Sequence, residues 1–167
     1  FNIPGSPPFS IAPASPLPAI TDPVTVNAAT QPGFAGTPIV ELNGTSASGA
    51  PGLRLLSAAN TTIRGLVINR FNNGGIQVAN SPSAIVVGNY IGTDIAGASA
   101  QGNGTYGVSI ETGSDNTLVG GATVADRNLI SGNSNSGVRV LSAANVVLRG
   151  NRIGTNAAGT LGLSGGA

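Results

Sequence analysis

Short stretches in which apolar and polar residues alternate recur along this chain of 167 residues. The clearest, residues 53–70, alternates, breaks at Ser-Ala-Ala-Asn, and then alternates again. Residues 138–155 repeat it without a gap, with Leu-Ser-Ala-Ala-Asn and Arg-Gly at matching positions. Alternation with a period of two predicts a β-strand, and the break predicts a tight turn. The chain is therefore expected to repeat a strand–turn–strand unit.

The same pattern predicts the length of each unit. Strands are expected to start at Gly52, Gly75, Gly107 and Gly137, which are 23, 32 and 30 residues apart. A short unit that is lengthened twice is typical of one structural repeat with loop insertions. A second strand is expected in each unit at 62–68, 84–87, 116–119 and 146–148, and a third at 89–91, 128–130 and 151–153.

Three short strands per unit, with no helical period between them, predict an all-β single-stranded parallel β-helix, a solenoid with loop insertions in its later coils. A β-sandwich or barrel would show hairpin-spaced strands without residue-level repetition, and a leucine-rich repeat would show a Leu-Asn signature and a helical return. We expect these residues to point inward and stack between coils: Leu55, Ile63, Ile68, Val78, Ile91, Ile110, Ile130, Val140 and Ile153.

The break between the first two strands of a unit carries Asn at matching positions. Asn60 and Asn145 are equivalent, Ser83 takes the same place in the coil between, and Asn116 falls within one residue of it in the next. Asn tolerates the left-handed backbone of a tight turn, and stacked Asn side chains can hydrogen-bond along the axis. We therefore predict a structural Asn/Ser turn ladder at these four positions rather than a ligand site.

The beginning of the chain differs from the rest, because seven of the eleven prolines fall in residues 1–23. Proline lacks the backbone N–H of a ladder, so this segment is expected to be an N-terminal arm or cap, and residues 24–167 to form the coils. No cap is evident after the last coil. Because the ends of a solenoid expose apolar surface and unpaired backbone groups, we expect either an excerpt from a longer chain or head-to-tail association with a second copy. Self-association is assigned to Phe1, Ile3, Phe9 and Ile11.

Composition narrows the classes of function. Charged residues are only 8% and the net charge is +1, which gives no attraction to nucleic acid. The chain has no apolar run of the ~20 residues that a membrane helix needs, so we expect no membrane insertion. It contains no Cys and therefore no disulfide or thiolate chemistry. A surface of Asn, Ser, Thr and Gly without Lys leads us to expect an extracellular or cell-surface location.

Four segments carry a resemblance to a known family: residues 15–25, 30–33, 88–94 and 127–133, the third reading Gly-Asn-Tyr-Ile-Gly-Thr-Asp. They resemble bacterial right-handed parallel β-helix repeat proteins of the pectin-lyase-like superfold. The resemblance implies a right-handed solenoid within a large secreted or surface-anchored protein. It also implies the chemistry to look for, since lyases of this superfold use carboxylate-bound Ca²⁺ with an Arg base and hydrolases use paired Asp.

Candidate metal and catalytic residues are few. Asp94 begins the first long loop and Asn156 is its counterpart in the last coil, so their oxygens could hold Ca²⁺, or simply form the turns that begin the loops. No other cofactor is expected. Glu111 ends a predicted strand and could face a groove. The six acidic residues include no DD, DxD or ExxE pattern of the kind that paired carboxylate chemistry uses.

Three sequons for N-glycosylation occur, at Asn43, Asn60 and Asn103. Asn60 is expected to be unavailable within the turn ladder, which leaves Asn43 and Asn103 as possible loop sites.

Taken together, these features predict a non-enzymatic extracellular structural module. It would stack end to end into a filament or form part of a large surface or adhesive protein. The alternative is a scaffold that binds carbohydrate or cleaves polysaccharide, with glycans as partners. With two Tyr and four Phe, the sequence offers few aromatic platforms for a sugar, which favours the structural module. An ice-binding surface would need a flat Thr array that Thr93 and Thr155 alone do not make.

Overall fold

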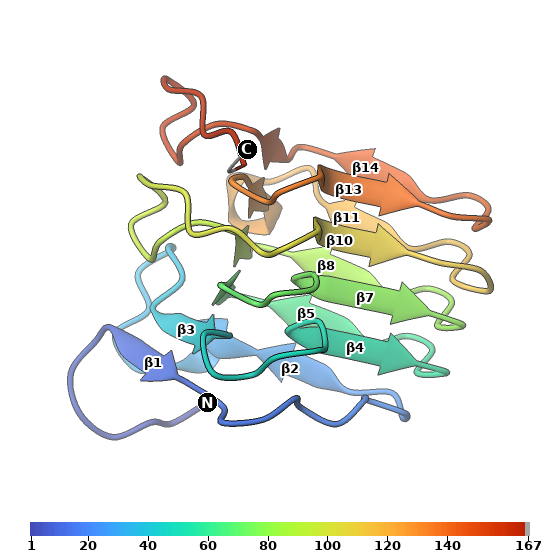
Figure 1. Ribbon diagram of the computed structural model, residues 1–167, viewed down its shortest axis with the longest axis horizontal. Coiled ribbons are helices and arrows are strands. Elements are labelled where there is room, and N and C mark those ends of the chain that lie inside the picture. The colour runs from blue at the N-terminus through green and yellow to red at the C-terminus, as the bar shows by residue number, and fades with distance from the viewer. Residues whose placement is uncertain (166–167) are drawn as a thin grey trace.

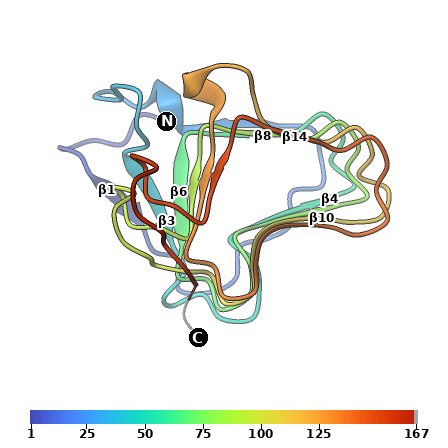
Figure 2. The ribbon, with the colours of Figure 1, turned by 90° about the horizontal axis from the view of Figure 1, so that it is seen from above.

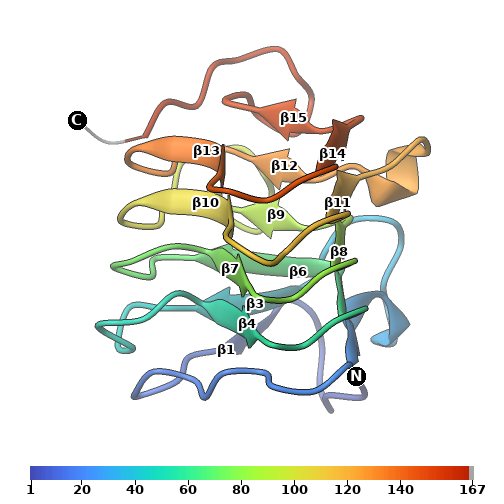
Figure 3. The ribbon, with the colours of Figure 1, turned by 90° about the vertical axis from the view of Figure 1, so that its right-hand side faces the viewer.

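The chain winds into stacked coils whose short strands form three sheets, of six, four and five strands (Figures 1 and 3). The computed structural model describes residues 1–165, so residues 166 and 167 of the predicted coil region lie outside the described residues. Every strand pair is parallel, which confirms the predicted parallel β-helix. Seen along the axis, the coils superimpose on one roughly triangular outline (Figure 2).

We name the sheets A, B and C. Sheet A consists of β1 (Phe9–Ile11), β3 (Val40–Asn43), β6 (Leu66–Asn69), β9 (Tyr90–Ile91), β12 (Leu129–Ile130) and β15 (Arg152–Ile153). Sheet B consists of β4 (Leu53–Leu56), β7 (Ile76–Ala79), β10 (Tyr106–Ile110) and β13 (Ser136–Val140). Sheet C consists of β2 (Thr25–Asn27), β5 (Thr62–Arg64), β8 (Ile85–Val87), β11 (Leu118–Gly120) and β14 (Val147–Arg149). Two 3₁₀ turns, η1 (Ala28–Thr30) and η2 (Val124–Asp126), complete the elements.

The predicted coil spacing is confirmed by the register of sheet B. Leu53 pairs with Ile76, Ile76 with Val108, and Val108 with Val138, so each partner follows one of the predicted glycines. The longer coils keep this register because the extra residues form loops at the corners. The prediction of a single strand over 62–68 is wrong, because the chain turns from sheet C into sheet A at Gly65.

Glycine is needed at this corner for two reasons. Gly65 has φ +75° and Gly88 has φ +66°, a left-handed conformation that disfavours any residue with a Cβ. A Cβ at Gly65 would also lie 2.7 Å from the backbone nitrogen of Ala29 in η1, and one at Gly88 would lie 2.8 Å from the carbonyl oxygen of Ala125 in η2. The corner glycines therefore let both 3₁₀ turns pack directly against the backbone of the solenoid.

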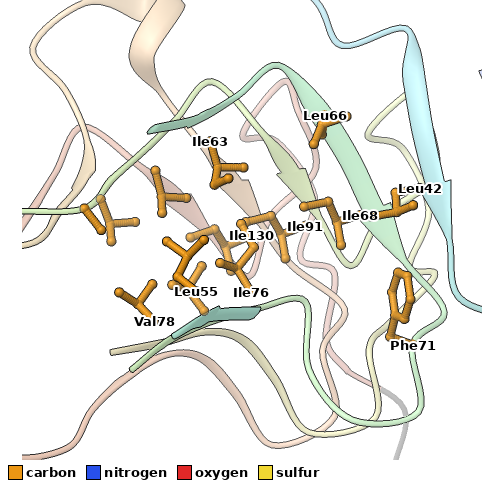
Figure 4. Packing of buried hydrophobic residues seen from close by; sticks show 14 of the residues in the cluster. Leu42, Leu55, Ile63, Leu66, Ile68, Phe71, Ile76, Val78, Ile91 and Ile130 are labelled. Atoms are coloured by element: carbon orange, nitrogen blue, oxygen red, sulfur yellow. The ribbon is translucent and has the colours of Figure 1, made fainter. Parts of the chain in front are cut away.

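The interior is filled mainly by aliphatic side chains, together with Phe9 and Phe71 (Figure 4). Seven of the predicted core residues are fully buried, with no exposed surface: Leu55, Ile63, Ile68, Val78, Ile91, Ile110 and Ile130. Because successive strand residues point to opposite faces, each inward residue meets its equivalents in the coils above and below. The alternation in the sequence thus predicts the core of the covered coils.

Val140 and Ile153 are the exceptions among the predicted core residues, since they are 41% and 49% exposed. They are in register with the buried residues Ile110 and Ile130, so they occupy inward positions. They are exposed because no coil covers β13 and β15 within the described residues.

The Pro-rich segment 1–23 lies against the first coil instead of extending away from it. β1 pairs with β3, and Ile20 forms an isolated parallel bridge with Leu55. Phe9 is buried, and Ile3 packs against the core while its N–H donates to Gln31 Oε1 at 2.8 Å. Residues of this segment thus pair with β3 and β4 of their own chain.

Candidate functional site

The predicted turn ladder lies at the corner between sheets B and C. Asn60, Ser83, Asn116 and Asn145 stack there in the left-handed conformation, with φ values of 58°, 59°, 59° and 54°. The conformational part of the prediction therefore agrees with the structure. The expected ladder of side-chain hydrogen bonds is wrong, because within residues 1–165 these four side chains make none with one another. They turn toward solvent, where water can satisfy them.

Buried amide ladders occur at the other two corners instead. Asn89 donates from its backbone N–H and Nδ2 to Asn128 Oδ1 at 2.9 and 3.2 Å, and Asn128 donates likewise to Asn151 at 3.3 and 3.0 Å. Asn103 repeats this geometry with Asn133, at 3.2 and 2.9 Å. Each inward amide satisfies backbone groups that the corner would otherwise bury without partners.

Sequence reasoning missed these ladders, although the Gly-Asn pairs at 88–89 and 150–151 precede equivalent strands. The coil between these two has no such Gly-Asn pair, because the segment containing η2 separates Gly120 from Asn128.

The two calcium candidates each organise their own loop. Asp94 Oδ1 accepts the N–H groups of Ala98 and Ser99 at 2.8 and 3.2 Å. Asn156 Oδ1 accepts those of Thr160 and Leu161 at 2.9 and 3.3 Å. This is the turn-forming role considered alongside calcium. In the described part of the chain, no three acidic side chains gather closely enough to hold a metal ion.

The sequons are placed differently from the expectation. Asn103 is fully buried and its Nδ2 also donates to the carbonyl of Ile68 at 3.2 Å, so its amide is not available to a modifying enzyme. Asn60, which was expected to be unavailable, has an exposed side chain. Asn43 is partly exposed, and its Oδ1 accepts from the N–H and hydroxyl of Thr45 at 3.0 and 2.7 Å.

A polar row covers the outer face of sheet B and includes Glu111. The Glu111 carboxylate accepts from Gln77 Nε2 at 3.0 Å and from Ser109 Oγ at 2.9 Å, and it pairs with Arg139 at 3.4 Å. The guanidinium of Arg139 also lies 4.2 Å from the centre of the Tyr106 ring. Glu111 is thus held by three neighbouring strands and not presented as a free acid.

The remaining carboxylates are also engaged. Asp126 pairs with Arg64 at 2.8 Å, and Glu41 with Arg70 at 3.1 Å. Hydrogen bonds from Thr123 and Arg64 hold the pKa of Asp126 below its ordinary value. Partial burial by itself raises the pKa of Glu41, but hydrogen bonds from Asn69 and Ser10, together with the charge of Arg70, lower it overall.

The other two acids bond locally. Asp115 Oδ1 accepts the N–H of Ala144 at 2.8 Å, and Asp22 accepts the hydroxyl of Thr21 at 3.1 Å.

The outer face of sheet A is hollowed. Tyr90, Leu129 and Arg152 are in register on β9, β12 and β15 and line the floor of a hollow of ≈ 140 Å³, which Arg127 and η2 border. None of these residues was selected from the sequence, because single Tyr and Arg residues in different coils form no motif.

No helix in the described structure is long and apolar enough to cross a membrane.

The geometry above is that of a known family. The model of the right-handed β-helix region matches residues 33–166. The chain belongs to this right-handed β-helix family. A search of curated proteins and a search of solved structures returned no match.

This right-handed β-helix has two differently built ends. At the C-terminal end, the inward residues Leu148 and Ile153 are 46% and 49% exposed, although their equivalents one coil earlier, Val119 and Ile130, are fully buried. At the N-terminal end, Ile11 is 39% exposed, and Phe1 is 41% exposed with its amino group bonded to Thr30 Oγ1. The residues assigned to self-association therefore divide into two exposed ones, Phe1 and Ile11, and two that pack within their own chain.

Proposed function

We propose that this β-helix is a non-enzymatic extracellular structural module that stacks end to end on further copies of itself. One observation carries the proposal. A single inward column of sheet A runs through all six strands: Ile11, Leu42, Ile68, Ile91, Ile130 and Ile153. Its four middle members are at most 5% exposed, whereas the two ends are 39% and 49% exposed.

A second copy placed head to tail would continue this column. Ile153 of one copy would meet Ile11 of the next, and β15 would lie beside β1 with the spacing of neighbouring coils. Burying apolar surface contributes about 25 cal/mol per Å², and the open edges of three sheets would gain backbone partners. Because such a contact is head to tail and need not close, it extends into a filament.

The remaining parts of the proposal rest on chemistry already described. The six acids all take part in hydrogen bonds or ion pairs that hold coils and loops, so polysaccharide cleavage has no free carboxylate pair in its support. The extracellular location is proposed from composition alone. The chain has no Cys and only 8% charged residues, so its surface is polar but largely uncharged.

Mixing two variants tests the arrangement. Ile11→Asp damages the N-terminal end of the column and Ile153→Asp the C-terminal end, so each variant alone should be monomeric by light scattering after size exclusion. An equimolar mixture should form dimers and nothing larger, because only one intact end of each kind remains. Val124→Asp, which changes a 76% exposed residue of η2 outside the inward columns, should associate as the parent does.

Two results would contradict the proposal. A parent chain that stays monomeric up to high concentration would exclude self-stacking. Dimers formed by Ile11→Asp alone would show that C-terminal ends meet each other, which is not a head-to-tail contact.

A further inference from the structure

The hollow on sheet A contains two cations without acidic partners. Three of the seven arginines, Arg64, Arg70 and Arg139, pair with acids. Arg127 and Arg152 form no ion pair among residues 1–165, yet both line this hollow. Two guanidinium groups without acidic partners make this hollow locally positive, which favours an anion there.

The hydrogen-bonding groups of these side chains are largely free. Arg127 donates from Nε to the carbonyl of Gly150 at 3.1 Å, and its two terminal nitrogens have no partner within the described residues. The guanidinium of Arg152 and the hydroxyl of Tyr90 likewise have none there. A guanidinium offers a planar fork of donors that matches an oxyanion.

The surroundings favour an anion of small size. Leu129, which is 2% exposed, lines the hollow together with Pro38 and Val124, and no residue that lines the hollow is acidic. The hollow of ≈ 140 Å³ has room for a carboxylate or sulfate group with a few attached atoms. Burial raises the pKa of Tyr90, although Arg152 opposes this, so its hydroxyl stays protonated at neutral pH and can donate.

We propose that the hollow formed by Tyr90, Arg127 and Arg152 is a binding site for a small oxyanion, a carboxylate or sulfate group. The site lies on the outer face of sheet A, and one of its residues, Arg152, belongs to the terminal strand β15. The coils bring its residues together from β9, from the segment after η2, and from β15, with Figure 2 showing η2 projecting from the side of the molecule.

Titration of the full chain by ¹H–¹⁵N NMR with sulfate, with sodium chloride at matched ionic strength as the reference, tests this site. Sulfate is expected to shift the amide signals around Tyr90, Arg127 and Arg152 and to saturate. Arg127→Gln and Arg152→Gln should each weaken binding about tenfold, the effect of losing one charge-assisted hydrogen bond. Tyr90→Phe should weaken it less.

Arg54→Gln is the matched control, because Arg54 is exposed on sheet B and has no acidic partner in the described structure. It should bind as the parent does, and circular dichroism should show all variants folded, since neither tested guanidinium bonds to an acid. Shifts that do not saturate, or an equal loss in Arg54→Gln, would overturn the site in favour of unspecific charge effects.

Titrations with acetate, glucuronate and uncharged glucose distinguish a free oxyanion from an anionic group carried on a sugar. Equal binding of acetate and glucuronate would support a site for free oxyanions. Tighter binding of glucuronate, with no binding of glucose, would support an anionic group carried on a sugar.

Discussion

At the scale of the residue, position along the axis decides what an inward side chain contributes. Ile110 and Val140 are in register on neighbouring strands of sheet B and point the same way. Ile110 is fully buried between two coils, whereas Val140 is 41% exposed. The same substitution at these two positions should therefore have very different costs.

Ile110→Asp is expected to lower the free energy of unfolding by on the order of 4 kcal/mol, because it buries a carboxylate without a partner. Val140→Asp should cost roughly 1 kcal/mol, since water reaches this position. Urea denaturation followed by circular dichroism measures both values. Equal costs would mean that the two positions do not share the direction that the register gives them.

Individual residues also show how far sequence reasoning reaches. Alternation predicted the seven buried core residues, because inward and outward positions follow from the period of a strand. It could not tell that Val140 and Ile153 are partly exposed, because this depends on which residues pack over them in space. Nor could it tell outward Asn60 from inward Asn103, since the same residue type serves a left-handed turn and a buried amide ladder.

At the scale of the element, the corners fix where strands end. The sequence predicted the units and their spacing because glycine and the alternating strands recur. It did not separate β5 from β6, because Gly65 lies within a continuous apolar pattern and only a turn into another sheet breaks it. The sequence also could not predict that η1 and η2 pack closely on this corner, because this packing depends on backbone contacts between segments distant in the sequence.

Substitutions at two glycines can distinguish the cost of a left-handed backbone from the cost of a steric clash. Gly88 and Gly154 have similar φ values of +66° and +75°, but a Cβ would clash with Ala125 only at Gly88, and Gly154 has nothing within 4 Å. Gly154→Ala should cost about 1–2 kcal/mol for the left-handed conformation alone. Gly88→Ala should cost clearly more, because η2 must also move. Thermal unfolding compares the variants; equal losses would show that η2 does not pack tightly on the corner.

At the scale of the whole molecule, stability should depend on pH through carboxylates that join segments far apart in the sequence. Glu41 on β3 accepts from Ser10 on β1 at 2.7 Å and from Asn69 on β6 at 2.9 Å. Its pKa is below the ordinary value of 4.5 in the folded chain. The unfolded chain therefore binds more protons as the pH falls, so the stabilisation is complete above about pH 4.5 and is lost as the pH drops through the folded pKa.

The melting temperature of the parent is accordingly expected to stay level near neutral pH and to fall below about pH 4.5. Glu41→Gln should melt lower than the parent at neutral pH and lose less on acidification. Asp22→Asn is the control, because Asp22 bonds only to the adjacent Thr21, and it should follow the parent curve. A Glu41→Gln curve parallel to that of the parent would contradict the assigned role of Glu41.

The loop insertions have a consequence for how such a molecule can diversify. The loops that begin at Asp94 and Asn156 each close on themselves through an antiparallel bridge, Thr93 with Ala100 and Thr155 with Gly162. The strands on either side keep their register although neighbouring coils differ in length. Because loop closure costs only a little more as a loop grows, we expect longer versions of these two loops to cost little stability. The surface at these loops is therefore expected to vary more readily, in evolution or by grafting, than the interior.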